Sequence, residues 1–508
     1  MTNKEITLEK EIRFSQSILW HDQKKYYDKK GIAAWDEDVP FYITSNPFIA
    51  KQYAHIAIGF IQDWLQKNPN AKNDPFTFLE LGAGTGQFSF YFLKNLITFQ
   101  KILQLDHIKI RYIMSDVTST PFEFWKTHHA LKPFVDSGVL EFMEYDLYHA
   151  NNRLKTNNPL IIIANYLFDS ISTDVFTVND GKLYESLVTL KTDASNSDNN
   201  HIIDWTKVDI SYTEKLIQEK YYHNEFDSIL FDYPKNLIDT HFQFPIAGLA
   251  ALKNLQALCN NQFLLITSDK GYTNLEELDH CEHPELDHHG SFSVMVNYHA
   301  IGEYLKQSGG EHIIQAFREN IVTGVFSSGF PLSTSPQLNL ATKQMIQGFS
   351  PTDYFLIYEH FIAHYKTCSL EIMSSYLNLS GWDPYVFDHI AEFLCDLADE
   401  GDPEVMSYLS EHMHLIADNF YFLPTSEDTL FNIGLFFQNA GQFDHAITYY
   451  QQSEKYFGQS DVVLFNMAMC LHSQEKNSEA IEQLQKALVL NADAEDAKEW
   501  IKVIQSEQ

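Results

Sequence analysis

The stretch FTFLELGAGTGQFSFYFL, Phe76 to Leu93, interrupts an apolar run with three glycines at alternate positions. Gly82, Gly84 and Gly86 separate a strand-like segment, Phe76–Leu81, from a helix-like apolar segment. Glycine allows positive φ and lets another molecule approach the backbone closely. A strand, a glycine turn and a helix in this order form a cradle for a nucleotide-type ligand. The stretch therefore predicts an α/β fold with a ligand site at the turn.

Strand-like runs recur along the chain at intervals of helix length. Each run is rich in apolar residues. Apolar runs separated by helices favour a mostly parallel sheet covered on both faces. The pattern therefore predicts a Rossmann-like, doubly wound α/β sheet. Its strands are expected in Phe76–Leu81, Ile108–Asp116, Val139–Asp146, Leu160–Phe168 and Gln262–Asp269.

The sheet domain is expected to span residues 75–335. Residues 1–74 precede it as an N-terminal helical cap, and their amphipathic segment Pro47–Gln66 is expected to cover the ligand site. An insertion is expected at about 190–240. Within it, the polar stretch SNSDNN, Ser195–Asn200, predicts an exposed loop.

The C-terminal part of the chain has helical periodicity and an internal repeat. LFNIGLFFQNAGQFDHAITYYQQ begins at Leu430, and LFNMAMCLHSQEKNSEAIEQLQK begins at Leu464. This 34-residue period resembles tetratricopeptide repeats, whose stacked helices present a surface to protein partners. An all-α repeat domain is therefore expected at 428–508, after a degenerate helical region at 345–425. The pairs 34 positions apart are Phe431 and Phe465, Asn432 and Asn466, Ala446 and Ala480, and Ile447 and Ile481.

Composition limits the classes of partner. The net charge of −33 argues against nucleic acid and anionic membranes, and it suits a cationic ligand or a basic protein surface. The five cysteines are scattered and form no CxxC pair, which predicts free thiols in a reducing compartment. No segment is long and apolar enough for a membrane span. A cytoplasmic location is expected.

The spacing of the glycines bears on the ligand. Dinucleotide sites usually have G-x-G-x-x-G, whereas this turn has G-x-G-x-G with Glu80 two residues before the first glycine. That arrangement resembles the first motif of S-adenosylmethionine-dependent methyltransferases. The resemblance implies S-adenosyl-L-methionine as the cofactor. Its contacts are expected to include Glu80, Gly82, Gly84 and Gly86.

Two acidic residues end the next two strands. Asp116 follows the second strand, where an acidic side chain can accept both ribose hydroxyls of a nucleoside. Asp146 ends the third strand and is expected to face the adenine edge. Each could instead be an ordinary surface acid after a strand.

A wider resemblance covers residues 20–330 in collinear order. The stretch LIIIANYLFDSISTDVFTVNDGKLYESLV resembles the segment after the fourth strand in MidA-like methyltransferases, a family similar to the mitochondrial complex I assembly arginine methyltransferase. FYITSNPFIAKQYAHIAIGFIQDWL, LLITSDKGY and GSFSVMVNYHAIGEYLKQSGG resemble three further family segments. The residues that match the first family segment are Ala164, Asn165, Asp169, Gly181, Glu185 and Val188.

The resemblance implies methylation of arginine in a protein substrate. Guanidinium pairs with carboxylates in a planar, two-pronged way, so the acceptor needs acidic partners. Asp169, with Asn165 beside it, is expected to orient the acceptor. Thr44, in the family's F-I-T-S segment, is expected among the cofactor contacts. Asp169 could instead be the N-cap of a helix.

Several polar positions of that family differ in this chain. Tyr166 replaces a glutamate, and Ser291, Met295 and Asn297 replace an aspartate, a histidine and a second aspartate. Two alternatives therefore stay open: a methyltransferase of small molecules, and an inactive methyltransferase-fold scaffold.

One cluster is rich in metal-binding residue types. DHCEHPELDHH, Asp279–His289, contains four histidines and a cysteine but has no standard zinc spacing. It is interpreted as a polar loop, and no metal is expected.

Overall fold

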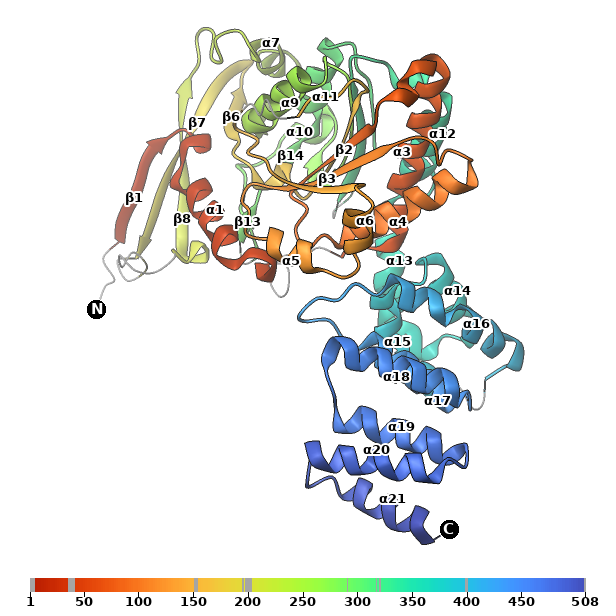
Figure 1. Cartoon of the computed structure of the whole chain (residues 1–508). Coiled ribbons are helices and arrows are strands. Elements are labelled where there is room, and N and C mark those ends of the chain that lie inside the picture. Colours follow the sequence, from red (N-terminus) through yellow and green to blue (C-terminus); the bar gives the residue numbers. More distant parts are fainter. Residues whose placement is uncertain are drawn as a thin grey trace. The chain divides into compact units, whose positions relative to one another are not determined.

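The structure is a computed structural model of the chain. It describes residues 5–34, 42–149, 154–193, 196, 203–289, 291–316, 318, 321–397 and 401–506. Its contacts divide the chain into two units (Figure 1). The α/β unit comprises residues 1–45 and 49–355, and the helical unit comprises residues 46–48 and 356–508.

The α/β unit contains a seven-stranded sheet, which confirms the predicted fold class. β4, β3, β2, β5 and β10 run parallel to one another, and β16 pairs with β10 in antiparallel register. The first of these strands along the chain, β2, lies between β3 and β5, so the strand order reverses at β2. Across the sheet the order is β15 (His312–Ile314), β16 (Val322–Ser328), β10 (Phe263–Asp269), β5 (Leu160–Asn165), β2 (Phe76–Leu81), β3 (Ile110–Asp116) and β4 (Leu140–Glu144).

Helices cover both faces of this sheet (Figure 1). α4 (Gln87–Ile102) packs its aromatic residues on one face, where the ring of Phe92 lies 5.5 Å from that of Phe78 and 5.6 Å from that of Tyr112. On the other face, α9 (Ile246–Leu258) and α11 (Tyr298–Gln307) bury leucines and isoleucines against β2, β3 and β5. Burial on both faces explains why the strands are continuously apolar.

Shorter elements complete the α/β unit. α3, the segment expected to be an amphipathic cap, spans Pro47–Lys67. The other helices are α5 (Phe122–Thr127), α6 (Lys132–Asp136), α7 (Asp227–Leu230), α8 (Tyr233–Asn236), α10 (Leu275–Leu278) and α12 (Pro336–Lys343). Two small strand pairs join β11 (Gly271–Tyr272) to β14 (Val296–Asn297) and β12 (Asp287–His289) to β13 (Ser291–Ser293).

A second, antiparallel sheet lies beside the first in the same unit. It contains an N-terminal strand in a region that the sequence predicted to be helical, and that strand is followed by helix α1 (Ile18–Lys30). EITLEKEI is too charged to be recognised as a strand, but it gains its backbone partners from β7, about 180 residues later. The sheet is formed by β1 (Glu5–Ile12), β7 (Lys182–Asp193), β6 (Asp174–Asn179), β9 (Asp239–Phe244) and β8 (Val208–Leu216).

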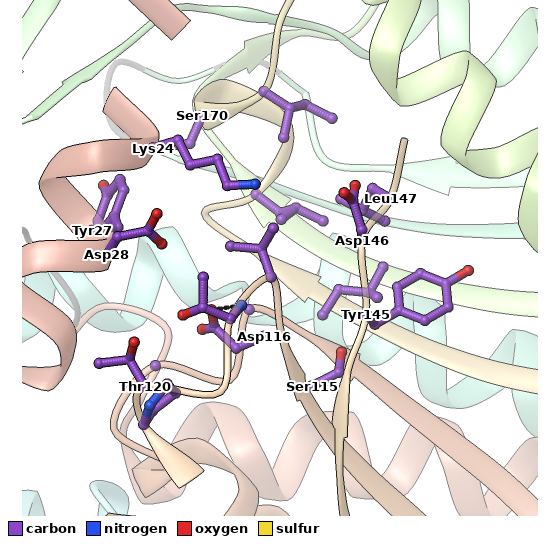
Figure 2. Close-up of a pocket in the computed structure, with 18 of the residues that line it drawn as sticks. Lys24, Tyr27, Asp28, Ser115, Asp116, Thr120, Tyr145, Asp146, Leu147 and Ser170 are labelled. Carbon is purple, nitrogen blue, oxygen red and sulfur yellow. Dashed lines mark hydrogen bonds between the residues drawn. The ribbon is translucent and has the colours of Figure 1, made fainter. Parts of the chain in front are cut away.

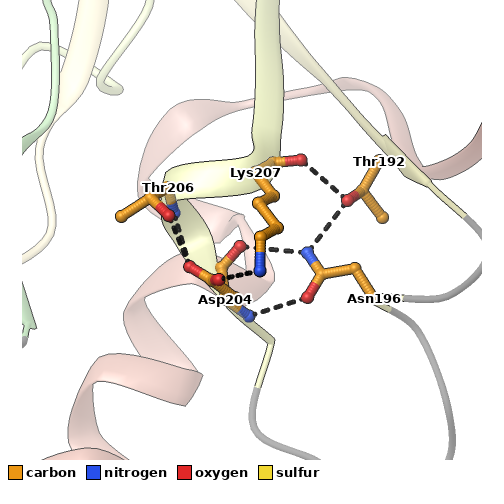
Figure 3. A network of polar contacts seen from close by, with 5 residues as sticks. All are labelled: Thr192, Asn196, Asp204, Thr206 and Lys207. Carbon is orange, nitrogen blue, oxygen red and sulfur yellow. Dashed lines mark hydrogen bonds and ion pairs between the residues drawn. The ribbon is translucent and has the colours of Figure 1, made fainter.

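A polar network lies at the end of the β7–β8 hairpin where the chain passes from β7 to β8 (Figure 3). The Asn196 amide donates to Thr192 Oγ1 (2.9 Å) and to the Asp204 carbonyl (3.0 Å), and the Asp204 N–H donates to Asn196 Oδ1 (3.1 Å). The Lys207 ammonium lies 2.6 Å from the Asp204 carboxylate. Apart from Asn196, the loop predicted at Ser195–Asn200 lies outside the described residues.

The helical unit contains successive helices, each packed on the next, as the repeat pattern predicted. The small residues Ala446 and Ala480 are fully buried between paired helices. The helices are α14 (Leu370–Leu379), α15 (Pro384–Asp396), α16 (Pro403–Asn419), α17 (Thr429–Asn439), α18 (Phe443–Phe457), α19 (Asp461–Ser473), α20 (Asn477–Leu490) and α21 (Glu495–Ser506), after α13 (Pro351–His364) at the boundary between the units.

Two sequence expectations concern the whole chain. All five cysteines are free thiols, as expected. Within the part of the chain that the structure describes, every helix is too short or too polar to cross a bilayer.

At one contact between paired helices, the two repeats differ in how large the facing side chains are. In the first repeat Gly434 faces Tyr450, and a Cβ added to the glycine would lie 2.5 Å from Tyr450 Cε1. In the second repeat the positions 34 residues later are Ala468 and Leu484, both fully buried. A small residue on one helix is therefore matched to a large one on its partner.

Gly434→Ala should destabilise the helical unit by about 1–3 kcal/mol, because it overpacks this contact. The double variant Gly434→Ala/Tyr450→Leu, which copies the second repeat, should recover most of that loss. Chemical unfolding monitored by circular dichroism measures both changes. A fully stable single variant would contradict the interpretation.

Candidate functional site

A cavity of about 210 Å³ opens at the carboxyl ends of the parallel strands, where the strand order reverses (Figure 2). Its walls come from the ends of β2, β3, β4 and β5 and from one side of α1. Open α/β sheets bind ligands at this position. Of the residues predicted from the sequence, Gly82, Gly84, Asp116 and Asp146 line the cavity.

The glycine turn forms the part of the wall that follows β2. Gly82, Gly84 and Gly86 have φ of 68°, 53° and 82°, all in the left-handed region that glycine adopts without strain. Gly86 begins α4, and its N–H donates to the Ala83 carbonyl (2.8 Å). The Trp125 indole donates to the Gly84 carbonyl (3.0 Å). Three left-handed residues thus turn the chain from strand to helix; Gly82 and Gly84 line the cavity, and Gly86 is not among its lining residues.

Asp116 lies at the end of β3 and lines the cavity beside this turn. Burial raises its pKa to about 6, although the N–H groups of Thr118 and Val117 favour the carboxylate, and the nearby charge of Asp28 raises the pKa further. Its Oδ1 accepts from the Thr118 N–H at 3.2 Å. Above pH 6 the side chain is therefore an ionised acceptor at the place expected for ribose hydroxyls.

Asp146 follows β4 on the adjacent wall. Its Oδ1 accepts from the Tyr148 N–H (2.9 Å), and its Oδ2 lies 3.0 Å from His149 Nδ1. Tyr145, Leu147 and Tyr148 line the same part of the cavity. This wall therefore combines an acceptor with apolar surface, a combination that suits a purine base.

The wall formed by α1 was not predicted from the sequence. Figure 2 shows Lys24 reaching over the cavity, with Tyr27 and Asp28 beside it. The helix is held in place by Gln23, whose amide donates to the Phe292 carbonyl at 2.7 Å. The spacing of these residues could have revealed this wall, because they recur at intervals of three and four positions and so share one face of a helix. The α1 residues in the wall are Trp20, Gln23, Lys24, Tyr27 and Asp28.

Glu80 does not line the cavity. Its side chain is buried behind β2, where its Oε2 accepts from the Ser89 hydroxyl of α4 and from the Tyr112 hydroxyl (2.7 Å). Burial raises its pKa to about 7, partly offset by these two hydrogen bonds. Side chains alternate along a strand, so the neighbouring Leu81 reaches the cavity and Glu80 faces α4. Glu80 thus braces the helix that follows the glycine turn.

Thr44 and Asn165 also lie away from the lining residues. Thr44 is buried in the turn before α3. Asn165 ends β5, and its Oδ1 accepts from the Tyr53 hydroxyl (2.8 Å). The same hydroxyl lies 2.6 Å from Ser268 Oγ, which joins the ends of β5 and β10 through one tyrosine of α3.

Asp169 is buried beneath the cavity wall, and it is paired with a residue that the sequence analysis missed. The Asp269 carboxylate, at the end of β10, accepts from the N–H groups of Leu167 (3.0 Å), Phe168 (2.9 Å) and Asp169 (3.3 Å). Burial, and then the adjacent Asp169 carboxyl, raise the pKa of Asp269 well above its usual range. The pair therefore retains a proton and fixes the segment that begins at Tyr166.

That segment forms the fourth wall of the cavity. Tyr166, Leu167, Ser170 and Ile171 line it, and the Ser170 hydroxyl donates to Asp169 Oδ1 at 2.7 Å. Tyr166 has a left-handed backbone, with φ of 49°. A non-glycine residue in this conformation is strained, and such strain concentrates at functional sites.

The donor and acceptor set fits S-adenosylmethionine. The glycine turn lets a ligand approach the backbone closely, and Asp116 and Asp146 offer hydrogen-bond acceptors. Apolar side chains line the cavity between these two acids. Among the described residues that line the cavity, Lys24 is the basic side chain, which suits the carboxylate of a methionine group.

The buried Glu80 makes stability depend on pH. Its pKa is about 7 in the folded protein, against 4.5 ordinarily. Between these values the folded state keeps a proton that the unfolded state has lost, so stability falls as pH rises. Relative to the wild type, Glu80→Gln should therefore gain about 3 kcal/mol in unfolding free energy between pH 4 and pH 8. Denaturant unfolding at both pH values measures this gain. The exposed Glu123→Gln is the control, and an equal response of the two variants would refute the assignment.

Two family models match parts of the chain. Residues 55–280 match the family model Methyltransf_28, described as "Putative S-adenosyl-L-methionine-dependent methyltransferase". Residues 427–457 match a tetratricopeptide repeat model. Comparison with curated proteins gave no match.

Solved structures that match this chain in the comparison include two with bound S-adenosyl-homocysteine. One is a protein from Burkholderia thailandensis, with 12% identity and a TM-score of 0.42, over 63% of this chain and 88% of that chain. The other is the N-methyltransferase NodS from Bradyrhizobium japonicum, with 10% identity and a TM-score of 0.28, over 60% of this chain and 98% of that chain. By the family matches, residues 55–280 resemble S-adenosyl-L-methionine-dependent methyltransferases and residues 427–457 resemble a tetratricopeptide repeat.

Proposed function

We propose that the α/β unit transfers a methyl group to an arginine of a protein substrate, and that the repeats recruit this substrate or a partner. The observation that carries the proposal is that the glycine turn, Asp116 and Asp146 meet in one cavity at the reversal of strand order. S-adenosylmethionine supplies an electrophilic methyl group on its sulfonium. Orientation of the acceptor supplies much of the rate enhancement in such transfers.

Three parts of the cavity wall hold the cofactor in this proposal. The backbone from Gly82 to Gly86 gives close approach, Asp116 accepts the ribose hydroxyls and Asp146 faces the adenine edge. Lys24 of α1 pairs with the methionine carboxylate. Glu80 contributes indirectly, since its bonds to Ser89 and Tyr112 fix α4 behind the turn.

The proposed acceptor site depends on the negative charge of the cavity wall and on the positioning role of buried Asp169. Asp28 lines the cavity and has no role in holding the cofactor in this proposal, so its carboxylate suits a guanidinium. Asp169 and Asn165 act here as positioning residues: Asp169 through Ser170 and Asn165 through Tyr53. Together they fix the wall against which the acceptor nitrogen would lie.

Cofactor binding can be tested at the turn. Gly84→Val places a branched side chain at a left-handed position in the cavity wall, so S-adenosylmethionine affinity should fall at least 100-fold in isothermal titration of the full chain. Gly138→Val is the matched control, because Gly138 is also left-handed (φ 74°) with open space around it. Wild-type affinity in both variants would exclude this cavity as the site. No binding by the wild type would favour the scaffold alternative.

The acceptor can be identified with labelled cofactor. Incubating the full chain and methyl-labelled S-adenosylmethionine with a cell lysate should place label in protein. Mass spectrometry should then find it on arginine. Asp169→Asn should reduce labelling at least 10-fold, while cofactor affinity changes less than threefold. Label only in small molecules would overturn the protein substrate, and label on another residue type would overturn arginine.

A further inference from the structure

A row of polar side chains crosses the antiparallel sheet, and none of them lines the cavity. In register, Glu214 of β8 pairs with Ser186 of β7, and Thr177 of β6 pairs with His241 of β9. β8, β7, β6 and β9 are successive neighbours in this sheet. The row therefore has long side chains on its outer strands and small ones on its inner strands.

Hydrogen bonds tie the row together. His241 Nδ1 lies 2.7 Å from Thr177 Oγ1, which lies 2.8 Å from Ser186 Oγ. The Ser186 hydroxyl donates to both carboxylate oxygens of Glu214, at 3.1 and 3.2 Å. Because the inner side chains are small, Glu214 and His241 lean toward each other across two intervening strands.

A histidine from outside the sheet completes the group. His283 lies in the segment before β12, and its Nε2 is 2.9 Å from Glu214 Oε1. Its ring stacks on that of His241, with centroids 3.6 Å apart, and on that of Tyr212 at 4.4 Å. One possible ligand atom from each of Glu214, His241 and His283 lies within 4.8 Å of the other two.

We propose that Glu214, His241 and His283 bind a divalent transition-metal ion, with Zn²⁺ as the fitting ion. Two imidazoles and a carboxylate are a common set of three protein ligands for zinc, and water takes the fourth position.

The hydrogen bonds around the group support metal binding. The bond from Thr177 to His241 Nδ1 leaves Nε2 for the ion, and Ser186 orients the carboxylate. Supporting bonds of this kind fix ring orientation and tautomer in metal sites. The side chains of Glu214 and His283 are 33% and 32% exposed, so an ion can enter from solvent. Once bound, it would fasten the segment around His283 to the sheet.

The site differs from the histidine cluster in the sequence. His280 in that cluster has a 70% exposed side chain beside Asp279, and the Cys281 thiol points to the Glu277 carbonyl. Of the cluster, His283 alone belongs to the proposed site, and the other two ligands lie on β8 and β9. Local spacing therefore could not reveal it.

Isothermal titration of the chelator-treated full chain with Zn²⁺ tests the proposal. The wild type should bind one ion with submicromolar affinity, and Co²⁺ in its place should give visible absorption typical of a four-coordinate site. His283→Phe keeps the ring stacking but removes the ligand nitrogen, and Glu214→Gln removes the charge. Each should weaken binding at least 30-fold.

His280→Phe is the matched control, since it removes an exposed histidine three residues before His283, and it should bind Zn²⁺ like the wild type. Circular dichroism of each variant should match that of the wild type, which separates loss of the site from loss of the fold. No binding by the wild type, or equal binding by all variants, would overturn the proposal. In that case Glu214 and His283 form an ion pair only. Neither result depends on methyltransferase activity.

Discussion

The α/β unit depends on a backbone constraint: three alternate residues in one turn, at positions 82, 84 and 86, must adopt left-handed φ. Glycine at 82, 84 and 86 satisfies that constraint without steric cost. The turn ends β2 at the reversal of strand order and begins α4 immediately. Because the neighbouring strands run parallel, their carboxyl ends meet at the same edge, and Asp116 and Asp146 come to line the same cavity as the turn.

Buried carboxyl groups organise the structure around that cavity. Glu80 fastens α4 through Ser89 and Tyr112, and Asp269 gathers three N–H groups of the segment that forms the fourth wall. Burial raises the pKa of both acids, so each costs stability when ionised. Glu80 and Asp269 thus hold α4 and the fourth wall in place. Asp116 and Asp146 remain available to a ligand.

The antiparallel sheet is coupled to the cavity through the N-terminus. β1 pairs with β7, and α1 follows β1 directly, so this pairing fixes the helix that supplies Lys24 and Asp28. Trp20 packs between Phe14 and Phe292, with ring centroids 5.4 and 5.1 Å away. Two of the proposed metal ligands, Glu214 and His241, lie on the same sheet. The antiparallel sheet therefore positions one wall of the cavity.

The sequence by itself determined the five parallel strands of the main sheet, the glycine turn, the helical period of the C-terminal region and the two acids at strand ends, but not β15 and β16. All of these follow from local pattern: apolar runs, a 34-residue repeat and the order strand, turn, helix. The tertiary structure alone decided that β1 joins β7, that α1 closes the cavity, that Glu80 faces α4 and that His283 meets Glu214 and His241. Those placements depend on contacts between residues far apart in the chain, where neither spacing nor residue type fixes which surfaces meet.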